Sequence, residues 1–329
     1  MNLRKALPAP PGRLLLYGLL VLVIALPSIE AGVRLRLLLK DPHRFEPGGL
    51  FTYPPNTQVG ETVELVTNNA GFFGVHLDTP KPAGTYRVFL MGSSPLTSPK
   101  LPAAMSEDLE KLRPDVQFEV NTTGLPRYTS YHNVLLFQRH LVELEPDCIV
   151  LYLGMNDNVY NTNPGLEEEP PAGLWDWRDL SRSVVLDMLD YHIIHKRFMT
   201  QPGFQTIRSA PIFEAHLRQI IEPARAHGID VLLVPMLASY PTEDDELLAV
   251  IRTAEGGMRH FWGDLEPGLE GLAAHHAVME KLSVEYGLPL LKIDGIPHAS
   301  ACFRDLCHFT DAGLDLLGQH FAEAVAAQL

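Results

Sequence analysis

The feature that most constrains the fold of this chain is an alternation of short apolar runs with amphipathic segments, from residue 86 to the C-terminus. The apolar runs predict buried strands at 86–91, 116–120, 148–153, 230–235 and 289–293. The segments between them predict helices at about 102–112, 130–144, 207–226, between 244 and 286, and at 310–328. Strands that alternate with helices form parallel βαβ units. We therefore predict an α/β protein, a three-layer α/β/α sandwich with a central parallel sheet.

The remaining stretches divide the chain into further parts. Residues 40–84 are rich in Pro and Gly with short alternating stretches, which predicts a linker and a small β-rich lead-in before a main domain at 85–329. Residues 156–204 interrupt the alternation with an acidic cluster and prolines, followed by a predicted helix at 180–199. We interpret 156–204 as an insertion in the main domain.

The N-terminus has a different character. Residues 1–13 form a basic leader without acidic side chains, and an almost wholly apolar run begins at residue 14 and continues, with charged interruptions, to residue 39. This pattern predicts a membrane-anchor helix at 14–39. A cleaved signal peptide is one alternative, although Pro27 and Glu30 stand where small residues would precede a cleavage site. A buried core helix is the other. The basic leader gives weak support to a main domain outside the cytoplasm.

Charge and cysteine content exclude several classes of function. The formal net charge of −14 argues against nucleic acid as a partner, because phosphate binding requires clustered Lys and Arg. The chain has 3 cysteines, which are too few for a disulfide scaffold and lack the spacing of a zinc site. The histidines also lack metal-ligand spacing. We therefore predict neither a metal nor a cofactor.

Ligands of open parallel sheets bind at the carboxyl ends of the strands, so the residues after each strand are the candidates for chemistry. The first predicted strand is followed by Gly92, Ser93, Ser94 and Pro95. A serine at a strand-to-helix turn presents its hydroxyl at the rim of the sheet, and Pro95 suits the first helical position. The competing interpretation is that the serines only cap the helix.

Two more sets of polar residues follow the same rule. Asn156, after the third predicted strand, has an amide that could donate to an oxyanion, although an Asx turn explains it equally well. Asp305 and His308 lie three residues apart just before the last helix. At this spacing the carboxylate can fix the imidazole tautomer and leave the other ring nitrogen as a base. A solvated polar loop is the alternative for this pair.

Together these stretches resemble one family. YRVFLMGSS (86–94), VNTTGLPRYTSYH (120–132), EPDCIVLYLGMND (145–157) and DLCHFTDAG (305–313) are similar to the sequence blocks of the SGNH/GDSL hydrolases. TNNAGFFG (67–74) resembles the lead-in of membrane-anchored bacterial members. The resemblance covers about 67–329, and it implies a flavodoxin-like sandwich behind an N-terminal anchor helix.

The resemblance implies a catalytic triad of Ser94, Asp305 and His308. It also implies an oxyanion hole formed by the N–H groups of Ser94 and Arg127 and by the side chain of Asn156. Arg127 departs from the family pattern, which has Gly here, and its N–H can serve unless the turn requires φ > 0. Gly124 would take that role if the register slipped.

In the oxidising compartment that an extracytoplasmic domain would occupy, Cys302 and Cys307 are candidates for a disulfide beside the triad. The function implied by the family is a serine esterase that cleaves a carboxylic ester, such as an acetyl ester on an envelope glycan or a lipid. The alternatives are an O-acyltransferase with the same triad and a catalytically inactive binding protein. The expected location is the membrane, with the catalytic domain extracytoplasmic.

Overall fold

The computed structural model describes residues 11–40, 44–46, 49–59, 65–166, 183–189, 193 and 200–329. The chain forms two compact units, which we describe separately. The smaller combines residues 1–41 with 173–198, and the larger combines 42–172 with 199–329. The larger unit contains the sheet and all the predicted catalytic residues, so it is the part that positions the site.

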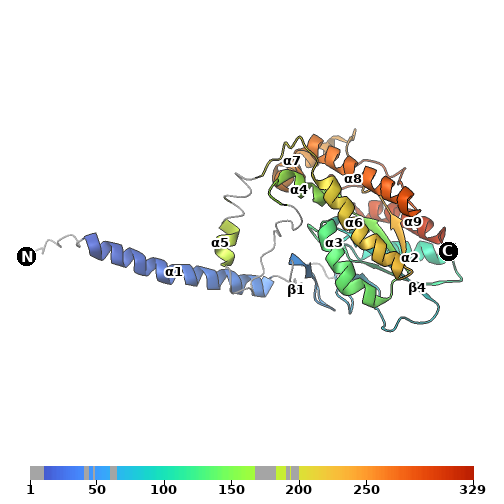
Figure 1. Cartoon of the computed structure of the whole chain (residues 1–329), viewed down its shortest axis with the longest axis horizontal. Coiled ribbons are helices and arrows are strands. Elements are labelled where there is room, and N and C mark those ends of the chain that lie inside the picture. Colours follow the sequence, from blue (N-terminus) through green and yellow to red (C-terminus); the bar gives the residue numbers. More distant parts are fainter. Residues whose placement is uncertain are drawn as a thin grey trace, which may run out of the picture. The chain divides into compact units, whose positions relative to one another are not determined.

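The larger unit is built around a sheet that includes β4 (Figure 1). The sheet has five strands in the order β3-β5-β4-β6-β7. The parallel strands are β4 (Thr85–Gly92), β5 (Gln117–Thr122), β6 (Cys148–Tyr152) and β7 (Asp230–Leu233). The edge strand β3 (Phe73–Gly74) comes from the lead-in and pairs with β5 in the antiparallel direction. The α/β prediction is therefore confirmed, with the correction that the sheet is mostly and not wholly parallel. A separate pair, β1 (Arg44–Phe45) and β2 (Phe51–Thr52), precedes it.

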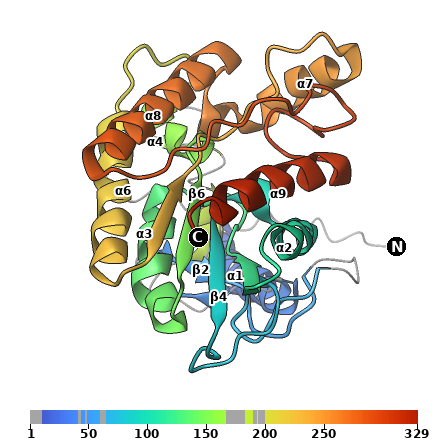
Figure 2. The same cartoon turned by 90° about the vertical axis from the view of Figure 1, so that its right-hand side faces the viewer.

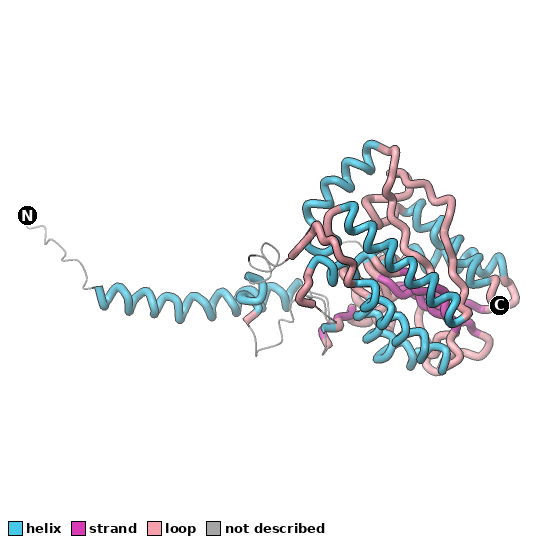
Figure 3. The backbone as a smooth tube through the Cα atoms, turned by 45° about the horizontal axis from the view of Figure 1, so that its top comes forward, coloured by secondary structure: helices cyan, strands magenta, loops and turns pink. Residues whose placement is uncertain are grey.

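Helices cover both faces of this sheet (Figures 2 and 3). On one face, α2 (Lys100–Leu112) packs against α9 (Asp311–Ala326) and contacts β5. On the other face lie α3 (Ser130–Leu136) and α6 (Ser209–Ala226), and α8 (Leu265–Tyr286) packs on α6. The core between β4 and the first helix pair is aliphatic and aromatic, with Val88, Leu90, Leu101, Met105 and Phe321 fully buried in one cluster.

Shorter segments complete the helical layers. The helical path of α3 continues through η3 (Phe137–Leu141) and η4 (Val142–Leu144). After β6 come η5 (Met155–Asn158) and α4 (Val159–Thr162), and α7 (Asp245–Trp262) precedes α8. The predicted insertion at 156–204 therefore begins with η5 and α4, whose residues are buried.

The fifth predicted strand, 289–293, is wrong as a strand. Its only ladder contact in the described chain is a parallel bridge from Leu290 to Leu233. Pro289 has no N–H to donate, and Lys292 is exposed, so this segment lacks both the donors and the two-sided burial of a central parallel strand.

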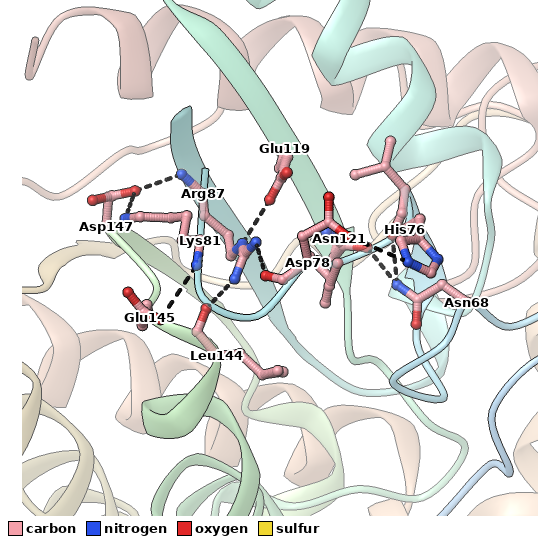
Figure 4. A network of polar contacts seen from close by, with 12 residues as sticks. Asn68, His76, Asp78, Lys81, Arg87, Glu119, Asn121, Leu144, Glu145 and Asp147 are labelled. Atoms are coloured by element: carbon pink, nitrogen blue, oxygen red, sulfur yellow. Dashed lines mark hydrogen bonds and ion pairs between the residues drawn. The ribbon is translucent and has the colours of Figure 1, made fainter. Parts of the chain in front are cut away.

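A buried ionic network holds the amino-terminal end of the sheet (Figure 4). The Arg87 side chain on β4 is fully buried and lies 2.6 Å from Glu119 on β5. Its other nitrogens donate to the carbonyl oxygens of Asp78 and Leu144. Arg87 therefore joins the lead-in, two strands and the end of η4 at one point, at the opposite end of β4 from Ser94.

The smaller unit contains α1 (Pro11–Lys40) and α5 (Val184–Leu189). The Glu30 carboxylate accepts hydrogen bonds from the N–H groups of Val184 and Val185, and it pairs with Arg34 at 2.7 Å. Within the described ranges, no helix combines the length and apolar character that a bilayer crossing requires. Of the helix predicted at 180–199, the structure describes only residues 183–189 and 193, and the rest lies outside the described residues.

Candidate active site

Ser94 stands directly after β4, at the carboxyl edge of the sheet. The strand ends at Gly92, where a Cβ would lie 2.3 Å from the carbonyl oxygen of Tyr152, so only glycine allows β4 and β6 to come this close. Ser93 is extended, and its side chain makes no capping hydrogen bond. Ser94 then opens a short helical turn, η2 (Ser94–Leu96), with Pro95 in its first turn, and remains partly exposed. The turn therefore presents the Ser94 hydroxyl where a substrate can reach it.

Asp305 and His308 lie on the loop before α9 and meet as the sequence predicts. His308 Nδ1 is 2.8 Å and 2.9 Å from the two carboxylate oxygens of Asp305. The same carboxylate accepts the backbone N–H groups of Cys307 and His308, both at 2.9 Å, and these bonds fix its direction. Across the gap, His308 Nε2 is 2.8 Å from Ser94 Oγ. The structure thus brings the three predicted residues into one hydrogen-bonded chain.

Electrostatics around His308 favour its protonated form. Burial lowers the pKa of His308, but the neighbouring Cys307 thiol and the Asp305 carboxylate raise it by more than burial lowers it, so the net shift is upward. Burial opposes ionisation of Asp305, yet its hydrogen bonds with His308 and the backbone lower the pKa of this carboxyl below its usual value. Asp305 is therefore ionised, and its charge favours the imidazolium form of His308.

Arg127 occupies a turn beside the carboxyl end of β4. A bridge between Ser93 and Leu125 places the turn beside β4, and Tyr128 N donates to the carbonyl of Leu125 across it. Arg127 has a φ of 66°, in the left-handed region, and follows Pro126 as the third residue of the turn. The sequence prediction named φ > 0 as the condition under which Arg is costly here, and the backbone has this conformation. Its cost is about 1–2 kcal/mol for an L-residue.

Gly124, the alternative to Arg127, has another role. A Cβ at this position would lie 2.5 Å from the carbonyl oxygen of Ser93, so glycine is needed for the close approach of the two loops. Thr97 Oγ1 also donates to the Gly124 carbonyl at 2.9 Å, which ties the turn after Ser94 to the same loop.

Asn156 lies on η5, just after β6, and is almost fully buried. Its Nδ2 donates to the carbonyl of Tyr128 at 2.9 Å, and its Oδ1 accepts from the indole N–H of Trp262 at 2.7 Å. Asn156 and the turn that contains Arg127 are therefore directly bonded, as members of one oxyanion hole would be. The hydrogen bond from Trp262 was not predicted. In the sequence, Trp262 is only an apolar residue at the end of a predicted helix, 106 positions from Asn156.

A second polar cluster, of Asp157, Ser130 and His216, includes the residue that follows Asn156 on η5. The buried Asp157 carboxylate accepts from both the N–H and the hydroxyl of Ser130, whose Oγ is 2.8 Å from His216 Nδ1. Burial raises the pKa of Asp157 to about 7, despite the bonds from Ser130, and lowers the pKa of His216 to about 4. His216 also lines a cavity of about 530 Å³ between α3 and α6, which contains none of the triad residues. The cluster fixes the start of α3 against η5.

A smaller cavity, of about 300 Å³, opens at the triad itself. Its lining includes Ser94 and His308, together with side chains of the η2–α2 connection and of the start of α9: Pro95, Thr97, Lys100, Phe309 and Leu314. The volume is at the lower end of the range of ligand pockets.

Cys302 and Cys307 are both free, buried thiols, so the predicted disulfide between them is not formed. Cys307 Sγ instead lies 3.7 Å from His308 Nδ1. In the described part of the chain, the cluster of potential metal ligands is Asp305, Cys307 and His308, whose ligand atoms lie within 4.8 Å of one another. Two of these three residues belong to the triad hydrogen-bond chain.

Comparison with known proteins gives structural likeness only. No family model matches the chain, and no curated protein matches it by sequence. Among solved structures, an acetylxylan esterase from Geobacillus stearothermophilus is similar, with 13% identity, a TM-score of 0.47, and coverage of 73% of this chain and 94% of that one. A lipase/acylhydrolase from Enterococcus faecalis has 16% identity, a TM-score of 0.45, and coverage of 74% and 97%. A GDSL-like lipase from Bacteroides thetaiotaomicron has 15% identity, a TM-score of 0.40, and coverage of 74% and 89%.

Proposed function

We propose that this protein is a serine ester hydrolase of the SGNH/GDSL type, with Ser94 as nucleophile, His308 as general base and Asp305 as the residue that orients the base. The observation that carries the proposal is the continuous hydrogen-bonded chain from Ser94 Oγ through His308 to Asp305, with contacts of 2.8 Å and 2.8 Å. A serine within hydrogen-bonding reach of an imidazole, itself held by a carboxylate, is the arrangement that activates a hydroxyl for acyl transfer.

The reaction follows from this order. Ser94 Oγ attacks the ester carbonyl carbon while its proton passes to His308 Nε2, and Asp305 stabilises the resulting imidazolium. The oxyanion would be held by the N–H groups of Ser94 and Arg127 and by the amide of Asn156. His308 then returns the proton to the leaving alcohol, which leaves an acyl-serine. A water molecule, deprotonated by His308, attacks the acyl group and releases a carboxylic acid and free Ser94.

The substrate that fits is a carboxylic ester with a small acyl group, because the cavity at the triad holds only about 300 Å³. An acetyl ester on an envelope glycan or lipid meets this description. We also propose that the N-terminus anchors the enzyme to a membrane, with the catalytic unit extracytoplasmic. This part rests on the sequence alone, namely the basic leader at 1–13 and the apolar run that starts at residue 14, and not on the structure, in which no helix of the described residues has the length and apolar character of a bilayer crossing.

The test of the catalytic proposal is labelling of the full chain with a fluorophosphonate probe, combined with hydrolysis of p-nitrophenyl acetate. Labelling mapped to Ser94 by mass spectrometry, and lost in Ser94→Ala and His308→Ala, is the expected result. A correctly folded chain that neither reacts nor hydrolyses the ester would refute the proposal. Labelled acetyl recovered on an acceptor sugar, with no free acetate, would instead identify an O-acyltransferase.

The anchor has its own test. The full chain should stay with the membrane fraction after alkaline carbonate extraction, and a chain that lacks residues 1–40 should not. Recovery of the full chain in the supernatant would contradict membrane anchoring and leave the catalytic proposal untouched.

A further inference from the structure

The amide of Asn156 is held from two sides. Its Oδ1 accepts the indole N–H of Trp262 at 2.7 Å, and its Nδ2 donates to the carbonyl of Tyr128 at 2.9 Å. Both Asn156 and Trp262 are more than nine-tenths buried, so water does not compete freely for these bonds. The amide therefore has one strongly preferred orientation.

The chemistry of the partners determines which orientation this is. An indole N–H only donates and a backbone carbonyl only accepts, so the amide oxygen must face Trp262 and the amide nitrogen must face Tyr128. A flipped amide would place NH₂ against N–H and oxygen against oxygen. In the observed orientation, one N–H of Asn156 Nδ2 bonds to Tyr128, and the second is the donor that the proposed oxyanion hole requires.

Trp262 is itself held firmly. It is the last residue of α7, and Gly263, with a φ of 90°, ends the helix there. The carbonyl of His260, in the same turn, accepts from Thr162 Oγ1 at 3.0 Å, and Thr162 belongs to the α4 helix that directly follows η5. The indole and the amide that it contacts are thus fixed on connected elements.

We propose that Trp262 is a positioning residue for the oxyanion hole, which orients the Asn156 amide so that its free N–H points to the developing oxyanion. The inference rests on the proposed hydrolase function, and it assigns Trp262 no contact with the substrate. Without the indole N–H, the Asn156 amide can rotate and lose its donor geometry. Transition-state stabilisation then falls while ground-state binding is unchanged, so the effect belongs in kcat and not in KM.

A double-mutant cycle tests this. Trp262→Phe keeps an aromatic ring in the core but removes the N–H, and we expect kcat for p-nitrophenyl acetate to fall by about 5–50-fold with KM unchanged. Asn156→Ala removes the donor itself and should lower kcat by about 10²–10³-fold. In the Asn156→Ala background, Trp262→Phe should have no further effect on kcat, because the group that it orients is gone.

Controls separate positioning from general damage to the fold. Phe261→Leu alters a buried neighbour on α7 and should lower the melting temperature with kcat unchanged. If Trp262→Phe does not fold, replacement of Trp262 by 3-benzothienylalanine keeps the shape of the indole and exchanges the N–H for sulfur. It should give the same fall in kcat at nearly full stability.

Two outcomes would overturn the inference. The first is a fall in kcat by the same factor in Trp262→Phe with and without Asn156. The second is a wild-type kcat with 3-benzothienylalanine at position 262. Either result, in an enzyme whose Ser94 still reacts with fluorophosphonate, removes the role of Trp262 and leaves the hydrolase proposal standing. An absence of both labelling and hydrolysis in the wild-type chain would remove both.

Discussion

Removal of the Arg87 guanidinium is the most direct test of what stabilises the larger unit. In Arg87→Met, the Glu119 carboxylate, whose side chain is only 10% exposed, would stay in the sheet without its partner. The carbonyl oxygens of Asp78 and Leu144 would lose their donors at the same time. The substitution keeps the volume of an unbranched side chain, so the loss comes mainly from polar groups left unpaired.

The magnitude follows from those groups. Breaking a buried ion pair by removal of one partner costs about 3–5 kcal/mol, because an uncompensated charge remains. The double variant Arg87→Met/Glu119→Leu has no such charge, and only the two carbonyl oxygens remain without a donor. Partial access to water should limit that cost to about 2 kcal/mol. The cost of the two carbonyl oxygens is common to both variants, so we expect the second substitution to restore about 3–5 kcal/mol of the free energy of unfolding.

Urea unfolding of the full chain, followed by fluorescence and by circular dichroism, measures these differences. Lys111→Met is the matched control, because it removes an exposed cation that contacts Asp108, and it should leave the unfolding midpoint unchanged. Activity of folded Arg87→Met should equal that of wild type. A loss below about 1 kcal/mol in Arg87→Met, or a double variant less stable than the single one, would refute the account of a charge left unpaired.

Three further predictions concern the site. The pH profile of kcat/KM should fall on the acid side with a midpoint above 6.5, because the raised pKa of His308 keeps this base protonated at lower pH. Asp305→Asn should move that midpoint down, and an unchanged midpoint would contradict the effect of Asp305 on the pKa of His308. Arg127→Gly should raise the free energy of unfolding by about 1 kcal/mol in urea titrations, since glycine adopts a φ of 66° without strain. Esterase activity should persist in this variant, because the turn keeps the backbone N–H of residue 127. The pKa of Asp157, raised to about 7 in the folded chain, means that its ionisation destabilises the fold as the pH rises from about 4 to 7. The stability of Asp157→Asn relative to wild type should therefore increase over this range and then level off, and a constant difference would show that Asp157 does not titrate there.

The alternation of strands and helices was readable because three of the buried strands are largely apolar. β4, β6 and β7 overlap the predicted apolar runs, since a parallel strand covered on both faces carries mostly apolar side chains on both. The strands at the edges of the sheet were harder to predict. β3 consists of only two residues, and the segment at 289–293 is apolar but makes a single bridge. Pairing at an edge depends on tertiary approach, which leaves little trace in local periodicity.

The site shows the same division. Ser94, Asp305 and His308 could be proposed because their chemistry depends on residue type and on position at the ends of elements. The sequence analysis named a positive φ at Arg127 as the condition under which Arg is costly there, but it could not decide the sign of φ. That sign depends on how the turn packs against Ser93. Trp262 could not be found at all. Its proposed role depends on one hydrogen bond across 106 positions of sequence, and an indole at the end of a helix carries no local signal of that bond.

The two ends of β4 have separate tasks, and this separation bears on how the protein can change over time. Arg87, in the ionic network, and Ser94, the proposed nucleophile, are seven positions apart, or about 23 Å of extended chain. Substitutions so far apart usually have independent effects on stability. Variants with substitutions around Ser94 that favour another ester would therefore keep the stability that the Arg87 network provides at the other end of the same strand. A lineage could explore new substrates without first rebuilding its fold.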